Sequence, residues 1–299
     1  MSQDLFLQKE IFDKFLKETD FNLSSYSFAN LYLWQDFFDF ELQVIDERLC
    51  VFAKNNLGSF LYLPPLGKDI SKKCIDLCFK ILNEKNHGKG VARIENIEGK
   101  DLDFFGEDDF VRFEKSKETI YLREDIAGLR GNQFKSKRFS YNYFVKNYNF
   151  EFCSFESRMD EDCLTLYDQW AETKKKKCND DIYCQMVDES RTALKRCLDS
   201  HKDLDITGRV VFVDGKIVGF SFGFPLKNDT FCILFEIVDL NFKGLASYIF
   251  SEFCKSKELE RFSFINVMDD FGLDNIRSTK LSFKPLKQIA TYTISQKDL

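Results

Sequence analysis

Three consecutive segments in the C-terminal half carry the alternating or continuously apolar pattern of strands, and a helical pattern follows them. The segments are 210–213, 217–222 and 231–239. Asp214-Gly215 separates the first two, and this pair favours a β-hairpin because glycine adopts a positive φ without strain. From Leu245 onward, apolar residues recur at helical spacing. The pattern predicts a hairpin, a third strand and a helix.

The same order of elements recurs in the N-terminal half, about 170 residues earlier. Residues 41–45 and 49–52 form a predicted hairpin, and 59–63 form a third strand. A helix follows, with Cys74 and Cys78 on its apolar face, and Asp69 is its expected N-cap. One large domain is the alternative, but the repeated order favours two.

The two halves differ where the third strand meets the helix. In the N-terminal half this junction reads Pro64-Pro65-Leu66-Gly67, and proline has no N–H group to offer a ligand. The C-terminal half is therefore the better candidate for binding a donor. The expected division is an N-terminal domain at 1–130, a basic interdomain helix at 131–150 and a C-terminal domain at 151–299.

Composition and charge narrow the function. Hydrophobic residues make up 44% of the chain and charged residues 31%, which is typical of a globular protein. The net charge of −6 argues against non-specific nucleic-acid binding by the whole surface. No secretory pattern and no long apolar stretch occur, so we expect no integral membrane segment and a cytoplasmic location. Ten cysteines without C-x-x-C spacing, and only two histidines, predict reduced thiols and no metal site.

Several motifs, in order along the chain, resemble a known family. They are S-F-A-N-L-Y-L-W at 27–34, L-x-x-D-I at 122–126, K-x-K-R at 135–138, F-E at 235–236 and K-G at 243–244. The chain resembles soluble relatives of the phosphatidylglycerol lysyltransferase C-terminal domain and, more distantly, the Fem-type peptidoglycan aminoacyltransferases. The resemblance implies an α+β fold of two tandem GNAT-like (acyl-CoA N-acyltransferase) domains, each a mixed, mainly antiparallel sheet flanked by helices. It also implies transfer of an aminoacyl or acyl group.

Glu236 is the first candidate for catalysis. Strict alternation along the third strand places it on one face with Cys232, Leu234 and Val238. A carboxylate on an apolar face is partly desolvated, which raises its pKa and suits it to act as a general base toward an amine. The alternative is a carboxylate at a polar rim or in a structural ion pair.

The loop after this strand is the expected donor-binding element. The GNAT-like pattern places the pyrophosphate of coenzyme A at the N-terminus of the following helix, where free N–H groups and the helix dipole attract anions. The alternative is an ordinary strand-to-helix connection. The residues expected to bind a cofactor are Asn241, Lys243, Gly244, Leu245 and Ala246.

Two further groups complete the candidate site. Asn266 ends a predicted strand beside the third strand, and with Asp270 it is expected to orient an amino group, although Asp270 also suits a helix N-cap. In the interdomain helix, Lys135, Lys137 and Arg138 are expected to contact tRNA or another polyanion.

These residues support an enzyme and leave two alternatives. The predicted function is a soluble aminoacyl- or acyltransferase that moves an acyl group from aminoacyl-tRNA or acyl-CoA to an amine or hydroxyl by direct transfer. The acceptor is a small amine, a peptide or a lipid headgroup. One alternative is a non-catalytic binding or regulatory module on the tandem GNAT fold. The other is a coenzyme A-dependent N-acetyltransferase of small amines.

Overall fold

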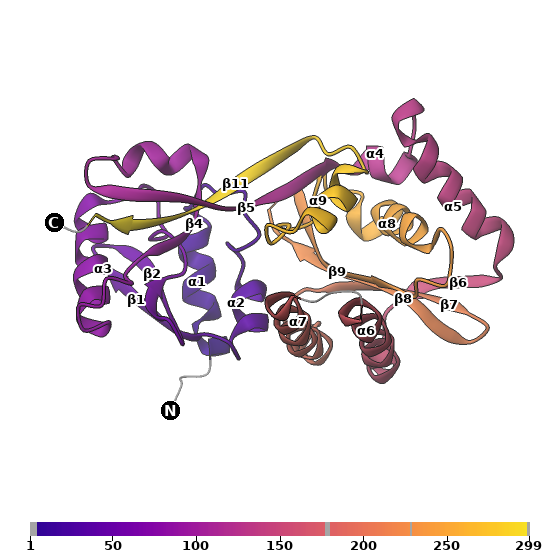
Figure 1. The fold of residues 1–299 in the computed structure, drawn as a ribbon, viewed down its shortest axis with the longest axis horizontal. Coiled ribbons are helices and arrows are strands. Elements are labelled where there is room, and N and C mark those ends of the chain that lie inside the picture. The colour runs from indigo at the N-terminus through magenta and orange to yellow at the C-terminus, as the bar shows by residue number, and fades with distance from the viewer. Residues whose placement is uncertain (1–4, 177–179, 228, 298–299) are drawn as a thin grey trace. The chain divides into compact units, whose positions relative to one another are not determined.

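The computed structural model describes residues 5–176, 180–227 and 229–297 (Figure 1). Cys178, one of the ten cysteines, lies outside these residues. The chain forms two compact units that are not continuous in sequence. The first contains residues 1–118, 269–273 and 288–299, and the second contains residues 119–268 and 274–287.

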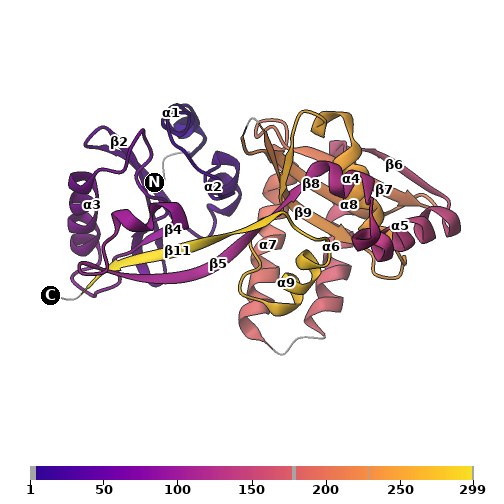
Figure 2. The ribbon, with the colours of Figure 1, turned by 90° about the horizontal axis from the view of Figure 1, so that it is seen from above.

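The first unit has helices on both sides of its strands, with α3 on one side and α1 and α2 on the other (Figure 2). The strand order is β1-β2-β3-β4-β11-β5. All pairs with residue-by-residue register are antiparallel except β3–β4, which is parallel. The elements are η1 (Leu5–Gln8), α1 (Lys9–Leu16), α2 (Phe28–Trp34), β1 (Asp39–Ile45), β2 (Arg48–Asn55), β3 (Gly58–Leu61), α3 (Lys72–Lys85), β4 (Ile94–Glu98), η2 (Gly99–Phe104), β5 (Phe110–Leu122) and β11 (Lys287–Gln296).

Local sequence explains the start of this unit. Asp46 and Glu47 both have positive φ, as a two-residue hairpin turn between β1 and β2 requires. Ser71, rather than the predicted Asp69, caps α3: its hydroxyl accepts a hydrogen bond from the Cys74 N–H. The Asp69 carbonyl instead accepts a hydrogen bond from the Arg48 guanidinium.

The second unit also has helices on both faces of its strands. Figure 1 shows α6 and α7 on one face, and α4, α5 and α8 on the other. The strand order is β5-β10-β9-β8-β7-β6, in which only the β9–β10 pair is parallel. The additional elements are α4 (Arg123–Gly128), η3 (Asn132–Phe134), α5 (Lys135–Asn147), β6 (Phe150–Ser154), η4 (Ser157–Met159), α6 (Asp160–Lys175), α7 (Asp181–Ser200), β7 (Thr207–Val213), β8 (Lys216–Pro225), β9 (Thr230–Val238), α8 (Leu245–Lys255), η5 (Lys257–Leu259), β10 (Phe264–Asn266) and α9 (Asp274–Leu281).

The predicted hairpin, third strand and helix are confirmed in this unit. Asp214 and Gly215 have φ values of 50° and 75°, which gives the tight turn between β7 and β8. The apolar face of α8 packs on the sheet: Leu245 and Ile249 lie in one buried cluster with Val218 and Val238. Burial of these aliphatic side chains fixes α8 over the end of β9.

The units do not coincide with the ranges 1–130, 131–150 and 151–299. The C-terminal strand β11 pairs with β4 and so belongs with the first unit, while α5 belongs with the second. The pattern of β11 predicts a strand but cannot identify its partner, because pairing between distant segments has no local signal. The division into two domains and an interdomain helix at these ranges stays a prediction.

In the part of the chain that the structure describes, every helix is too short or too polar to cross a lipid bilayer.

Candidate functional site

The pairing between β9 and β10 stops early. Residues 264–266 of β10 pair with residues 230–232 of β9, and the ladder ends at Asn266 and Cys232. Strand β9 continues to Val238, still paired with β8 on its other side. The last part of β9 therefore has an edge that β10 does not cover.

The N–H groups along this edge follow from the pairing with β8. The Asp239 N–H donates to the Val218 carbonyl at 2.7 Å, and Val238 lies opposite Gly219. Because N–H groups alternate in direction along a strand, those of Glu236 and Val238 point away from β8. They are directed toward the side where the β10 ladder has ended.

A β-bulge determines which face Glu236 occupies. The register shifts so that Phe222 lies opposite Phe235, whereas Gly223 lies opposite Ile233, which leaves Leu234 as the extra residue. Glu236 therefore shares its face with Val238, as predicted, and with Ile233 instead of the predicted Cys232, because the strict alternation fails at the bulge. The bulge turns Glu236 toward the layer between the sheet and α8.

Glu236 sits in a strongly desolvating environment although part of its surface remains accessible. Burial raises the pKa of its carboxyl to about 8, and the nearby Lys137 ammonium opposes the rise. The pKa of the Tyr121 hydroxyl is raised by burial and, in addition, by the charge of Glu236. This carboxyl is thus held close to its titration point at neutral pH, as a general acid–base group requires.

Lys137, on α5, is the cation whose charge lowers the pKa of the Glu236 carboxyl. Its ammonium lies 3.7 Å from the centre of the Phe283 ring, which is a cation–π contact. Burial lowers the pKa of Lys137, the charge of Glu236 opposes that shift, and Lys284 adds to it. Lys137 is therefore partly buried near Glu236.

Ser221 is a candidate that the sequence analysis missed. It lies directly opposite Glu236 on β8, in a pair that does not exchange backbone hydrogen bonds, so the two side chains are close neighbours on one face. Its hydroxyl is buried and has no hydrogen-bond partner among the described residues. No local signal indicated Ser221, because its position depends on the register between β8 and β9.

The predicted donor loop is packed against α5. A Cβ atom on Gly244 would lie 2.1 Å from the Ser140 carbonyl oxygen, so helix packing requires glycine there, and binding of a cofactor by this loop stays a prediction. The Lys243 ammonium lies 4.7 Å from the centre of the Tyr143 ring. The Asn241 side chain bonds Asp239. Of the remaining two residues, Leu245 is buried in the core and Ala246 is exposed.

The three basic residues of α5 that were predicted to bind a polyanion differ in their surroundings. Arg138 donates to the carbonyls of Leu129 and Gly131, which ties the start of α5 to the turn after α4. Lys137 faces the Glu236 region, and Lys135 is exposed. Of the three, only Lys135 presents its charge freely to solvent, and contact with a polyanion stays a prediction.

Asn266 and Asp270 are both buried and both stabilise local turns. The Asn266 side-chain oxygen accepts a hydrogen bond from the Met268 N–H, and Asp270 accepts one from the Gly272 N–H. The β9–β10 ladder ends where Asn266 lies opposite Cys232. Cys232 is four residues before Glu236, which is roughly 13 Å along β9. Asp270 belongs to the first unit, and α9 begins only at Asp274, so Asp270 is not its N-cap. The structure does not place Asn266 beside Glu236.

Comparisons with solved structures support the predicted fold. A conserved protein of unknown function from Bacteroides thetaiotaomicron is 25% identical, with 99% of each chain covered and a TM-score of 0.86. The L-PGS structure from Bacillus licheniformis is 18% identical, with 97% of this chain and 92% of that chain covered and a TM-score of 0.64. The structure of FemX is 9% identical, with 94% of this chain and 95% of that chain covered and a TM-score of 0.62.

The fold class is confirmed as α+β with tandem GNAT-like domains, and the described strands form one mixed sheet of 11 strands flanked by helices. No curated protein matches the sequence. The model of one family, described as "Phosphatidylglycerol lysyltransferase, C-terminal", matches residues 17–295. That match spans most of the 299 residues, and the motifs that suggested the resemblance lie within it. The chain therefore belongs to the phosphatidylglycerol lysyltransferase C-terminal family.

Proposed function

We propose that the second unit transfers an acyl or aminoacyl group from an activated ester or thioester to an amine or hydroxyl, with Glu236 as the general base. The observation that carries this proposal is the environment of Glu236. Its carboxyl has a pKa raised to about 8 and is turned by a bulge into the layer below α8, beside the uncovered edge of β9. A structural surface carboxylate would need neither the burial nor the bulge.

The proposed step is direct transfer. Glu236 takes a proton from the acceptor amine or hydroxyl, whose nitrogen or oxygen then bonds to the carbonyl carbon of the donor. The N–H groups of Glu236 and Val238, which point away from β8, are suited to stabilise the oxyanion. When the carbon–oxygen or carbon–sulfur bond of the donor breaks, the leaving oxygen or sulfur takes the proton from Glu236.

Ser221 and Lys137 would assist as positioning residues. The buried Ser221 hydroxyl is placed to accept a hydrogen bond from protonated Glu236 or from the acceptor. The Lys137 ammonium favours the ionised form of Glu236, because opposite charges attract more strongly in a desolvated site. Asn266 and Asp270 are proposed only as supports of the turns near the end of β10.

The donor is proposed to be aminoacyl-tRNA or acyl-CoA. Family membership and the fold shared with L-PGS and FemX support an aminoacyl donor, and the GNAT-like fold supports acyl-CoA. The acceptor is proposed to be a small amine, a peptide or a lipid headgroup. Exposed Lys135 on α5 is proposed to attract the polyanionic part of such a donor.

A non-catalytic binding or regulatory module is the second candidate, and one observation favours it. Gly244 is packed on the Ser140 carbonyl, and Lys243 is occupied with the Tyr143 ring, so the loop expected to bind a pyrophosphate is largely engaged by α5. A module of this kind would bind its ligand without turnover.

The two candidates are distinguished by a transfer assay. The full chain is incubated with labelled aminoacyl-tRNA or acetyl-CoA and a panel of amines, hydroxyl compounds and lipids, and labelled product is measured. We expect Glu236→Gln to lower transfer by at least 100-fold, because the loss of a general base costs that much. Glu260→Gln, which alters an exposed carboxylate of the same unit, is the matched control. Equal turnover by both variants would remove Glu236 from the mechanism, and donor binding without turnover by the wild type would favour the module.

A further inference from the structure

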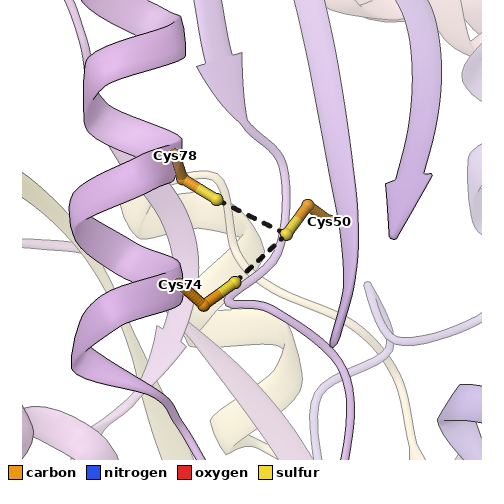
Figure 3. A group of neighbouring side chains, drawn as sticks. All are labelled: Cys50, Cys74 and Cys78. Atoms are coloured by element: carbon orange, nitrogen blue, oxygen red, sulfur yellow. Dashed lines mark hydrogen bonds between the residues drawn. The ribbon is translucent and has the colours of Figure 1, made fainter. Parts of the chain in front are cut away.

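Three cysteines converge in the core of the first unit, although they are separated in sequence. Cys74 and Cys78 are one helical turn apart on α3, and Cys50 lies opposite them on β2. The Cys50 sulfur is 3.5 Å from that of Cys74 and 3.4 Å from that of Cys78 (Figure 3). All three sulfur atoms lie within 4.8 Å of one another, and all three residues are fully buried.

This cluster is unique among the described residues. No other group of three or more cysteine, histidine or acidic side chains in the described part of the chain converges closely enough to hold a metal ion. The other described cysteines of the structure, such as Cys163 and Cys197, are not part of such a group. The expectation of scattered thiols without a metal site rested on the absence of C-x-x-C spacing, and it did not consider a cysteine supplied by a strand opposite a helix.

The surroundings restrict the kind of ion. Apolar side chains form the rest of this core, including Phe52, Ile75 and Phe79. Among the residues that the structure describes, no histidine or carboxylate joins the three sulfurs as a fourth ligand. Structural zinc sites are almost always four-coordinate, so a set of three sulfurs is a poor match for Zn²⁺. Soft thiolate ligands also select Cu(I), which is stable with three sulfur ligands.

We propose that Cys50, Cys74 and Cys78 form a three-coordinate sulfur site for Cu(I) in the first unit. Metal–sulfur bonds of about 2.3 Å place the sulfurs of a trigonal centre about 4 Å apart. The two shorter sulfur–sulfur distances, 3.4 and 3.5 Å, therefore need to open by only about half an ångström. Side-chain rotation in α3 and β2 can supply that change. The site is independent of the transfer function proposed for the second unit.

The test is a competition titration with the full, reduced chain under anaerobic conditions. Cu(I) is presented as its complex with a chromogenic chelator, and transfer to the protein is followed by the loss of chelator colour. We expect one equivalent to be withdrawn by the wild type, and X-ray absorption of the loaded protein to show three sulfur ligands. Removal of one ligand should weaken this binding at least 100-fold in Cys50→Ala and in Cys78→Ala.

Cys163→Ala is the matched control, because Cys163 is a buried cysteine on α6 outside the cluster. It should bind Cu(I) as the wild type does, and Cu(I) should raise the melting temperature of both but not that of Cys50→Ala. Circular dichroism checks that each variant is folded, and Cys78→Ala replaces Cys50→Ala if the latter is not. Equal Cu(I) affinity in the cluster variants and in Cys163→Ala would overturn the proposal. Preferential binding of one Zn²⁺ by the wild type would overturn the assignment to a monovalent cation.

Discussion

The two units share one plan and differ where a strand passes into a helix. In each, two antiparallel pairs are followed by a parallel pair joined through a helix: β3–α3–β4 in the first unit and β9–α8–β10 in the second. In the first unit the junction is closed. Leu66 exchanges both backbone hydrogen bonds with Leu49, and the Gly67 N–H donates to the Thr19 hydroxyl.

In the second unit the same junction is held by hydrogen bonds within its own loop: Asn241 donates to the Asp239 carboxylate, and the Leu245 N–H donates to the Phe242 carbonyl. The N-cap Gly244 offers no side chain to the first turn of α8, whereas Ser71 caps α3 in the first unit. The second unit also carries the desolvated carboxyl of Glu236. The two junctions are therefore held differently: the first by hydrogen bonds to other segments and by a serine cap, the second by hydrogen bonds within its loop and by packing on α5.

A substitution at Gly244 is expected to cause the largest loss of stability. Gly244→Ala should destabilise the protein by about 3 kcal/mol or more, because its φ is 91° and the new Cβ would overlap the Ser140 carbonyl. Gly88→Ala is the control: its φ is 68°, but nothing lies within 4 Å of the new Cβ, so only about 1 kcal/mol of backbone strain is expected. Urea unfolding measures both, and equal losses would show that α5 does not press on Gly244.

The pH dependence of stability tests the raised pKa of Glu236 in the second unit. Glu236 has a folded pKa of about 8, above the value of about 4.3 in an unfolded chain. Between these values the folded state keeps a proton that the unfolded state has lost, so stability falls as pH rises through this window. We expect a loss of roughly 3 kcal/mol between pH 5 and 9, after allowance for partial exposure. Glu236→Gln should remove this slope in urea unfolding, and Glu260→Gln should keep it.

The smallest effect concerns the capped junction of the first unit. Ser71→Ala should cost about 1 kcal/mol, since the hydroxyl that accepts from the Cys74 N–H is lost. Ser71→Asp should restore most of that stability, because aspartate also caps helices. If Ser71→Ala is neutral in thermal unfolding, the first junction is not held by its cap.

The sequence predicted local features well. The turn at Asp214-Gly215, the strands beside it and the amphipathic α8 follow from short-range pattern and turn chemistry, and each lies where it was expected. The basic helix predicted within residues 131–150 is also confirmed as α5. These elements depend on residues within a few positions of one another.

The site was less predictable because it depends on distant partners. The bulge at Leu234 changes the face of Glu236, and only the pairing with β8 reveals it. The contact of Gly244 with Ser140 joins residues about 100 positions apart, and it reassigns a glycine that matched a ligand-binding loop. In the first unit, the spacing of Cys74 and Cys78 was visible, but Cys50 joins them only through the packing of β2 on α3.

The central claim is that Glu236 is a desolvated carboxyl poised to exchange a proton near neutral pH. Carbon-13 labelling of glutamate side chains allows its titration to be followed by NMR, and the signal absent from Glu236→Gln assigns the residue. We expect the Glu236 carboxyl to titrate with a midpoint at about 8. A midpoint near 4.3, the value of an ordinary glutamate, would contradict it.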